Sequence, residues 1–95
     1  MFQPDLLKGK RILVTGGGTG LGRSMAHRYL ELGANVVICG RREDVLKETA
    51  AELAKETGGE IETVGCDVRV ADAVEAMMDK IWEKRPLDIL VNNAA

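Results

Sequence analysis

The stretch RILVTGGGTGLG at residues 11–22 decides how the rest of the chain is interpreted. Its short apolar run predicts a β-strand, and five glycines and two threonines follow at once. A helix should begin at about Gly20, because apolar residues then recur at helical spacing as far as Leu32. Glycine lets a backbone approach a ligand closely, and the free N–H groups of a helix N-terminus favour phosphate. The stretch therefore has three interpretations: a dinucleotide-binding turn, a P-loop for a nucleoside triphosphate, or a flexible turn without a ligand.

Outward from this stretch, strands and helices alternate along the whole chain. The strands are nearly continuous apolar runs, which is typical of a parallel sheet covered by helices on both faces. Repeated strand–helix–strand units with right-handed crossovers predict an α/β fold, a doubly wound parallel sheet of Rossmann type. We expect the strand order 3-2-1-4, with flanking helices. Strands are predicted at residues 10–15, 34–40, 60–66 and 87–93, and helices at 20–32, 43–59 and 70–84.

Each predicted helix has an apolar stripe that should face the sheet. These stripes are Leu21, Met25, Tyr29 and Leu32 in the first helix, Leu46, Ala50, Leu53 and Ala54 in the second, and Val74, Met77, Met78, Ile81 and Trp82 in the third.

The last predicted strand also carries an expectation about completeness. It is patterned for burial on both faces, yet the sequence ends two residues after Asn93. A strand of this kind usually has helices on both sides and another strand beyond it. We therefore expect residues 1–95 to be the first half of a larger single α/β domain.

Composition excludes several classes of function. The net charge is −2, and acidic and basic residues are interspersed along the chain, which argues against a nucleic-acid partner. No apolar run is long enough to span a membrane and no signal peptide is recognised, so we expect a cytoplasmic protein. Cys39 and Cys66 lack the spacing of a zinc site or a disulfide framework, and are expected to be buried reduced thiols. No metal site is predicted.

The glycine spacing separates the three interpretations. The common fingerprint G-x-G-x-x-G fits no register, whereas T-G-x-x-x-G-x-G fits at Thr15, Gly16, Gly20 and Gly22. The P-loop pattern also comes close, but Arg23 stands where its phosphate-binding lysine should be, and the two cations are not equivalent. A flexible turn without a ligand would cost chain entropy for no gain.

Three motifs now lie in order, each at the carboxyl end of a predicted strand. Together they resemble the short-chain dehydrogenase/reductase family, over essentially the whole chain but only over the cofactor-binding half of a family member. Ala95 departs from the family, which usually reads Asn-Asn-Ala-Gly at this point. The motifs are the glycine pattern of residues 15–22, the pair Asp67-Val68, and the triplet Asn92-Asn93-Ala94.

The resemblance implies a role for each matching residue. Asp67 would accept a hydrogen bond from the adenine amino group beside the Val68 backbone, although it could instead be a helix N-cap. Asn92 would brace the sheet beside the cofactor ribose, or be a strand-end turn residue, and Ala94 belongs to the same motif. Thr15 would tie the turn together or bond a phosphate oxygen. Backbone groups would wrap the pyrophosphate at Gly16, Gly18, Thr19, Gly20, Leu21 and Gly22.

The end of the second strand indicates which cofactor is bound. Members that bind NAD usually carry an acid there, which accepts hydrogen bonds from the ribose hydroxyls. This sequence has Gly40 at that place and Arg41 next, with Arg42 following. Arginine makes charge-assisted hydrogen bonds to a 2′-phosphate, which an acid would repel. We therefore predict an NADP-binding domain, with Arg42 either a second contact or a solvated loop residue.

No catalytic residue is predicted within the chain. The family uses a Tyr-x-x-x-Lys pair that would lie beyond residue 95, whereas Tyr29 looks like a core residue and His27 like a surface residue. The resemblance implies hydride transfer to a small-molecule carbonyl or enoyl/dienoyl substrate, faintly nearest the dienoyl- and enoyl-CoA reductase branch. We expect the intact protein to be a homo-oligomer. A non-catalytic NADP-sensing protein is the alternative.

Overall fold

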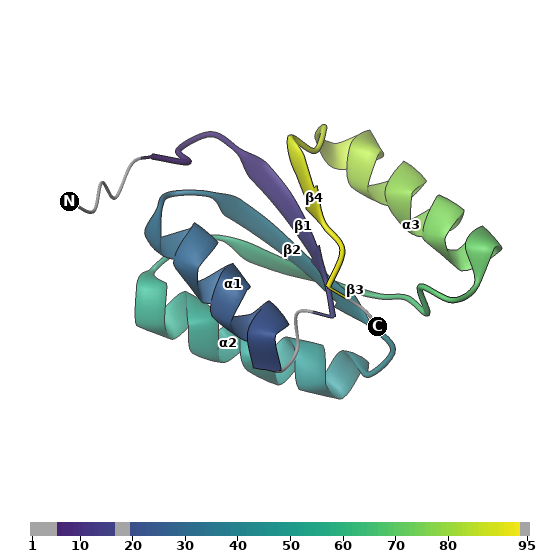
Figure 1. Cartoon of the computed structure of the whole chain (residues 1–95), viewed down its shortest axis with the longest axis horizontal. Helices are drawn as coiled ribbons and strands as arrows, with labels where there is room; N and C mark the ends of the chain where they lie inside the picture. Colours follow the sequence, from purple (N-terminus) through teal and green to yellow (C-terminus); the bar gives the residue numbers. More distant parts are fainter. Residues whose placement is uncertain (1–5, 17–19, 94–95) are drawn as a thin grey trace.

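The computed structural model describes residues 6–16 and 20–93, and its centre is a parallel sheet with helices on both faces (Figure 1). The four strands lie in the order β3-β2-β1-β4, as predicted. No helix of the described residues is both long and apolar enough to cross a membrane. In chain order the elements are β1 (Arg11–Thr15), α1 (Gly20–Glu31), β2 (Asn35–Gly40), α2 (Glu43–Thr57), β3 (Ile61–Gly65), α3 (Ala71–Lys84) and β4 (Ile89–Val91).

The register brings the ends of all four strands together. β1 pairs with β2 as far as Thr15 opposite Cys39, and with β4 as far as Val14 opposite Val91. β2 in turn pairs with β3 as far as Gly40 opposite Gly65. Because the strands are parallel, the chain leaves all of them at one edge, which we call the carboxyl edge. Ligands of open α/β sheets bind at this edge.

The core lies in two layers, one on each face of the sheet. Helices α1 and α2 cover one face and α3 covers the other (Figure 1). The first layer contains Ile12, Val14, Ala26, Leu30, Ala34, Val36, Ile38, Leu46 and Leu53. The second contains Leu13, Val37, Cys39, Cys66, Met77 and Ile81.

Burial on both faces is confirmed for the two central strands, whereas the two outer strands are partly exposed in this chain. β1 is buried along its whole length, and so are the four inner residues of β2. In β4, however, Ile89 is 39% exposed and Leu90 56% exposed. Both β3 and β4 have a neighbouring strand on one side only, so part of their apolar surface remains accessible.

The expected helix stripes need two corrections. Leu21 of α1 is 67% exposed and Trp82 of α3 is 51% exposed, although both occupy apolar positions at helical spacing. The face of α1 that is fully buried is Gly22, Ala26 and Leu30, displaced by one residue from the predicted stripe. Small residues on this face let the helix lie close to the sheet. Larger side chains such as Met25 and Tyr29 pack from its flank, as partly buried residues.

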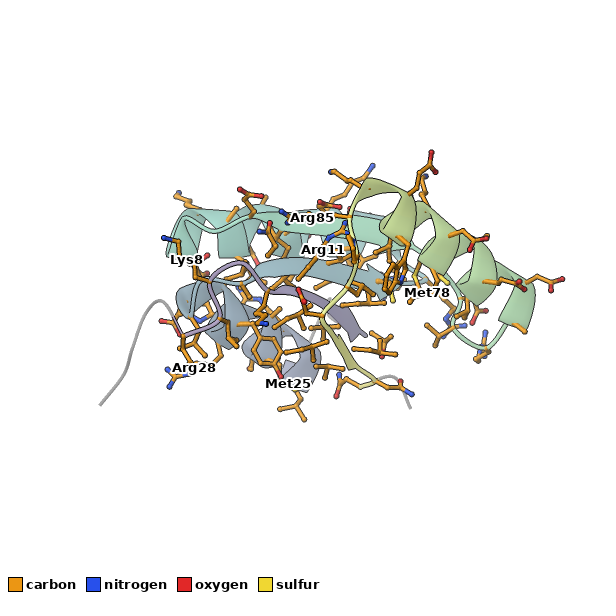
Figure 2. The ribbon with its side chains drawn as sticks, turned by 90° about the horizontal axis from the view of Figure 1, so that it is seen from above. Lys8, Arg11, Met25, Arg28, Met78 and Arg85 are labelled. Atoms are coloured by element: carbon orange, nitrogen blue, oxygen red, sulfur yellow. The ribbon has the colours of Figure 1, made fainter. Side chains whose placement is uncertain are left out.

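A buried arginine fastens the opposite edge of the sheet. The Arg11 side chain is 2% exposed and lies on the α3 face, where it extends towards the end of α3 near Arg85 (Figure 2). Its Nη1 donates to the carbonyl oxygen of Ile81 at 2.8 Å and to that of Arg85. Its Nη2 lies 3.2 Å from Oε2 of Glu62, across β2 on β3. One side chain therefore joins β1, β3 and the C-terminal turn of α3.

Two hydrogen bonds also join the start of β1 to the residue that precedes β4. The backbone N–H of Arg11 donates to Oδ2 of Asp88 at 2.8 Å, and the N–H of Asp88 donates to the Arg11 carbonyl at 2.8 Å. Burial raises the pKa of Glu62, but the hydrogen bonds and charges of Lys84 and Arg11 outweigh it, so that this pKa is lowered. Glu62 is thus held as a carboxylate beneath α3.

We predict that Arg11→Met lowers the free energy of unfolding of the full-length protein by about 2–4 kcal/mol, because carbonyl groups at the end of α3 lose a buried donor. Methionine keeps most of the apolar stem and removes the guanidinium. Urea unfolding followed by circular dichroism measures the change. The control is Arg85→Ala, which removes an exposed guanidinium from the same region and should stay within about 0.5 kcal/mol of the wild type. Equal effects for the two variants would contradict the role given to Arg11.

Candidate functional site

Two adjoining cavities open at the carboxyl edge. The β2 pocket has a volume of about 250 Å³ and the β3 pocket one of about 170 Å³. They share Gly16, Gly40 and Arg41, so they form one continuous depression across the ends of β1, β2 and β3. The β2 pocket is also lined by Cys39, Arg42, Val45 and Leu46, and the β3 pocket by Cys66, Asp67, Val68 and Arg69.

The depression brings together residues that the sequence predicted separately. Arg41, Arg42, Asp67 and Val68 all line it, although they come from different strand–helix connections. Three of the predicted residues, Gly18, Thr19 and Ala94, lie outside the described part of the chain.

The chain leaves β1 through a backbone that needs glycine. Gly16 has φ +67°, a left-handed conformation, and its N–H donates to the Cys39 carbonyl at 2.9 Å. Gly20 also has a positive φ of +59°, and a Cβ atom added there would meet no atom of the neighbouring described residues within 4 Å. Open space beside a bare Cα at a helix N-terminus leaves room for a ligand to contact the backbone.

Gly22 needs its missing side chain for a different reason. A Cβ atom at this position would overlap the carbonyl oxygen of Gly16 and would lie 2.8 Å from Nδ2 of Asn93. The first turn of α1 therefore sits directly against the chain that leaves β1 and the chain that leaves β4. The two glycines serve different purposes, Gly22 for packing and Gly20 for an open surface.

Thr15 ties the ends of β1 and β4 together. Its side chain is buried, and its hydroxyl donates to Oδ1 of Asn92 at 3.1 Å and accepts from the N–H of Asn93 at 2.8 Å. These bonds fix the chain as it leaves β4. These bonds reach the chain that leaves β4, so the two roles expected for Thr15 in the glycine turn stay predictions.

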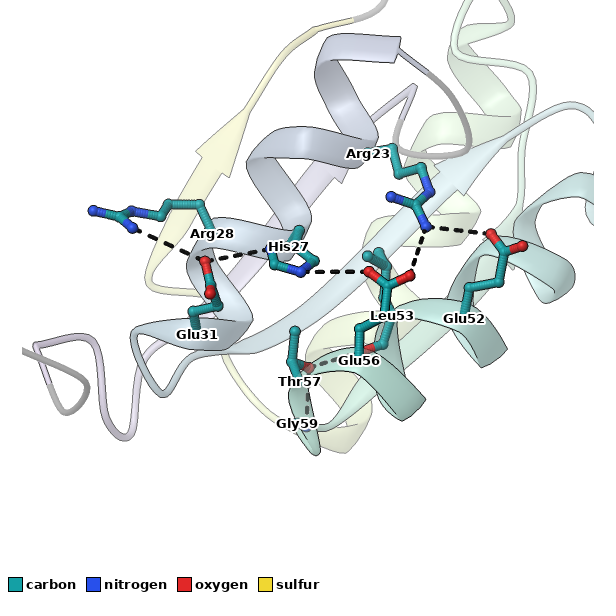
Figure 3. Close-up of polar contacts among 9 residues, drawn as sticks. All are labelled: Arg23, His27, Arg28, Glu31, Glu52, Leu53, Glu56, Thr57 and Gly59. Atoms are coloured by element: carbon teal, nitrogen blue, oxygen red, sulfur yellow. Dashed lines mark hydrogen bonds and ion pairs between the residues drawn. The ribbon is translucent and has the colours of Figure 1, made fainter.

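An ion network shows where Arg23 points. Its Nη2 lies 3.3 Å from Oε1 of Glu52 and 3.3 Å from Oε2 of Glu56, both on α2 (Figure 3). His27 lies in the same network, with Nδ1 3.3 Å from Glu31 and Nε2 3.4 Å from Glu56. The P-loop interpretation needs a cation at position 23 that reaches phosphate. Since Arg23 pairs with α2 instead, this geometry argues against a P-loop.

Asp67 is held by a neighbour that the sequence analysis missed. Its Oδ1 accepts from the backbone N–H of Arg69 at 3.0 Å and from Nε at 3.1 Å, while its Oδ2 accepts from Nη2 at 3.0 Å. These Arg69 hydrogen bonds, with a smaller contribution from the Arg41 charge, lower the pKa of Asp67 to about 2. The alternative that Asp67 is a helix N-cap is wrong, because Val70 occupies that position of α3.

The N-terminus of α2 borders the β2 pocket, and no side-chain hydrogen bond caps it. Arg42 is the N-cap of this helix and makes no side-chain capping bond, and Val45 and Leu46 of the first turns line the pocket. The free N–H groups and the helix dipole make such a terminus attractive to an anion. The acids Glu43 and Asp44 are exposed in the same turn.

Two buried thiols form part of the pocket floor, Cys39 in the β2 pocket and Cys66 in the β3 pocket. Burial, and to a lesser extent the nearby Cys66, raise the pKa of Cys39 to about 11 against a smaller opposing effect of the Gly16 backbone. Burial and the Asp67 charge raise the pKa of Cys66. Both thiols therefore stay protonated near neutral pH, as expected for inert buried cysteines.

Comparison with known proteins agrees with this geometry. A family model described as short chain dehydrogenase matches residues 10–95. The chain belongs to this family. Among curated relatives of this short chain dehydrogenase, a Caenorhabditis elegans protein named "Probable 2,4-dienoyl-CoA reductase 3" is 48% identical over 97 residues. That alignment covers 100% of this chain and 31% of the relative, so the chain spans about a third of such a protein.

Solved structures of other short chain dehydrogenases have the same fold. A citronellol catabolism dehydrogenase of Pseudomonas aeruginosa PAO1 superposes with a TM-score of 0.92 at 41% identity, over 97% of this chain and 38% of that one. An L-sorbose reductase of Gluconobacter frateurii, solved with NADPH and L-sorbose, superposes with a TM-score of 0.90 at 31% identity, over 98% and 36%.

No metal centre is found in residues 6–16 and 20–93 of the short chain dehydrogenase, since no three His, Cys, Asp or Glu side chains are suitably grouped there. Tyr29 is partly buried against the core beneath α1, and His27 is paired on the surface.

We predict that Gly22→Ala destabilises the full-length protein by about 2–3 kcal/mol. The new methyl group would overlap backbone atoms, which cannot rotate away as a side chain could. The matched control is Gly40→Ala, whose Cβ atom would lie 3.6 Å from Leu46 Cδ2, an ordinary contact. That variant should remain within about 0.5 kcal/mol of the wild type. Thermal unfolding of both variants measures the difference, and a harmless Gly22→Ala would show that α1 does not need this close approach.

Proposed function

We propose that residues 1–95 form the NADP-binding part of a Rossmann-type domain, and that the intact protein is an NADP(H)-dependent oxidoreductase. The observation that carries the choice of cofactor is the β2 pocket. It has Arg41 and Arg42 on its wall and Gly40 at the end of β2, where an NAD-binding member usually has an acid. The L-sorbose reductase solved with NADPH, similar over 98% of this chain, supports the same choice.

The residues of the carboxyl edge fit the parts of this cofactor. Gly20 leaves open space at the N-terminus of α1, which suits a pyrophosphate. The uncapped start of α2 beside Arg41 suits a 2′-phosphate, and Asp67 offers a carboxylate to an adenine amino group. Asn92, tied to Thr15, would lie beside a ribose. Leu21 would take part through its backbone, because its side chain is exposed.

The reaction we propose is hydride transfer between NADPH and a small-molecule substrate. NADPH supplies the hydride when it is bound. The residues of this chain would bind and orient it, while the proton-transfer groups would come from outside the chain. We propose that the substrate is either a carbonyl compound or an enoyl or dienoyl compound, the latter linked to CoA. The chain is 48% identical to a protein named as a probable 2,4-dienoyl-CoA reductase, which supports the CoA-linked substrate.

A non-catalytic NADP-sensing protein is the second candidate, because the described residues account for binding alone. The two candidates differ in turnover: a sensor binds NADPH without oxidising it in the presence of any carbonyl or enoyl compound.

We also propose that the intact enzyme is a cytoplasmic homo-oligomer.

We predict that Arg41→Ala in the full-length protein weakens NADPH binding about 10- to 150-fold and leaves NADH binding nearly unchanged, because a charged hydrogen bond contributes about 1.5–3 kcal/mol. Titration of the quenched tryptophan or nicotinamide fluorescence measures both affinities. Arg42→Ala is the companion variant, and a smaller effect is expected if Arg42 is mainly solvated. Equal losses of both cofactors for Arg41→Ala would mean that Arg41 supports folding and does not select the cofactor.

We predict that Gly20→Val weakens NADPH binding at least about 10-fold, because a branched side chain would occupy the open space at the N-terminus of α1. Gly9→Val is the matched control, since Gly9 also has a positive φ, +81°, and open space around its Cα atom. Both variants carry the strain of a branched residue at positive φ, but Gly9 precedes β1 at the opposite edge of the sheet. If the two variants bound NADPH equally well, the pyrophosphate would have to be assigned elsewhere.

A further inference from the structure

Arg69 makes an unusually complete set of bonds to a carboxylate only two residues before it. The backbone N–H and Nε of Arg69 both reach Oδ1 of Asp67, and Nη2 reaches Oδ2. The guanidinium thus grips the carboxylate as a two-pronged fork, while the backbone bond closes the turn between the two residues. Both side chains line the β3 pocket together with Arg41.

The bonds can be counted against what a carboxylate accepts. Two carboxylate oxygens offer about four lone-pair positions, and an ionised carboxylate has no hydrogen to donate. Arg69 takes two positions on Oδ1 and one on Oδ2. Among the described residues, one acceptor position therefore remains, on Oδ2 of a residue that lines the β3 pocket. A 6-amino group of adenine is such a donor, whereas a carbonyl oxygen at the same ring position is not.

An exposed ion pair by itself contributes little to stability. The Arg69 side chain is 66% exposed and that of Asp67 30% exposed, so this pair is a weak candidate for holding the fold together. The ion pair instead orients the Asp67 carboxylate, because three hydrogen bonds in one turn fix the torsion angles of the Asp67 side chain. A carboxylate that is already oriented loses less conformational freedom when a ligand binds.

We propose that Arg69 is a positioning residue of the β3 pocket, which holds the Asp67 carboxylate so that its remaining acceptor position faces the 6-amino group of adenine. This inference rests on the proposed NADP(H) site, and it adds a residue outside the three matched motifs. Arg69 acts through Asp67 and does not itself touch the cofactor. Its contribution is therefore specific for the base at the adenine end.

The test compares two cofactors in the full-length protein: NADPH, and its hypoxanthine analogue, in which a carbonyl oxygen replaces the 6-amino group. The wild type should prefer NADPH by about 10-fold, because at ring position 6 the amino group can donate to Asp67 and the carbonyl oxygen cannot. In Arg69→Ala this preference should fall by about 3- to 10-fold, through weaker NADPH binding with little change for the analogue. Isothermal titration calorimetry measures all four dissociation constants.

A second readout needs no cofactor. The Asp67 carboxyl carbon, followed by NMR during acid titration, should report a pKa of about 2 in the wild type and a value that moves back towards 3.8 in Arg69→Ala. Arg69→Lys keeps the positive charge but loses the two-pronged guanidinium. Compared with Arg69→Ala, it should recover more of the lowered Asp67 pKa than of the preference for adenine over hypoxanthine. Lys80→Ala removes a positive charge from the second half of α3 and should change neither readout.

Three outcomes would overturn the positioning role. The first is an adenine preference that Arg69→Ala leaves unchanged, and the second is an equal loss of both cofactors. The third is a loss of the preference for NADPH over NADH in Arg69→Ala, which would mean that Arg69 binds the 2′-phosphate directly. The wild type alone tests the underlying site: if it bound neither NADPH nor NADH, the proposed function itself would fail, whatever the variants did.

Discussion

Helix α1 can start where it does only because residue 22 has no side chain. The first turn of the helix lies against the Gly16 carbonyl and the Asn93 amide, at a separation that leaves no room for a Cβ atom. This contact brings the helix N-terminus to the ends of β1 and β4, which Thr15 already joins through its hydroxyl. The bare surface at Gly20, where we propose that the pyrophosphate binds, depends on this close approach.

The positive charges are divided between the two edges of the sheet. At the amino edge, the buried Arg11 fastens α3 to the sheet, and its Nη1 and Nη2 atoms have carbonyl and carboxylate partners on the other elements. At the carboxyl edge, Arg41 and Arg42 are exposed at the mouth of a pocket. Stability and the proposed cofactor binding therefore involve different arginines at opposite ends of the same strands. A substitution at one edge can be interpreted with little reference to the other.

The fold followed from short-range patterns, and its prediction was largely correct. Apolar runs, helical spacing and the glycine turn are local signals, and they gave the element bounds to within about two residues. The strand order expected for a sheet of Rossmann type is confirmed as well. Exposure was harder to predict, because Leu21 and Trp82 have apolar side chains at helical spacing and yet point to solvent. Whether such a position is covered depends on which segments pack against it, and no local pattern contains that information.

The site shows the same division. Arg41 and Asp67 were assigned from their places at strand ends, and the pockets lie there. The full burial of Arg11 could not be predicted, since its partners Glu62 and Ile81 are 51 and 70 positions away. Arg69 is different, because Asp-x-Arg after a strand is a local signal that could have suggested the fork.

The buried thiols have a consequence for the electric field inside the depression. Cys39 and Cys66 lie beneath the place where a dinucleotide would carry its negative charges, and their raised pKa values keep them neutral. An aspartate of similar size at either position would oppose the field of Arg41, whereas a protonated sulfur leaves that field undiminished. Because the thiolate is the reactive form of cysteine, the same protonation also protects the pocket floor from alkylating agents and peroxides.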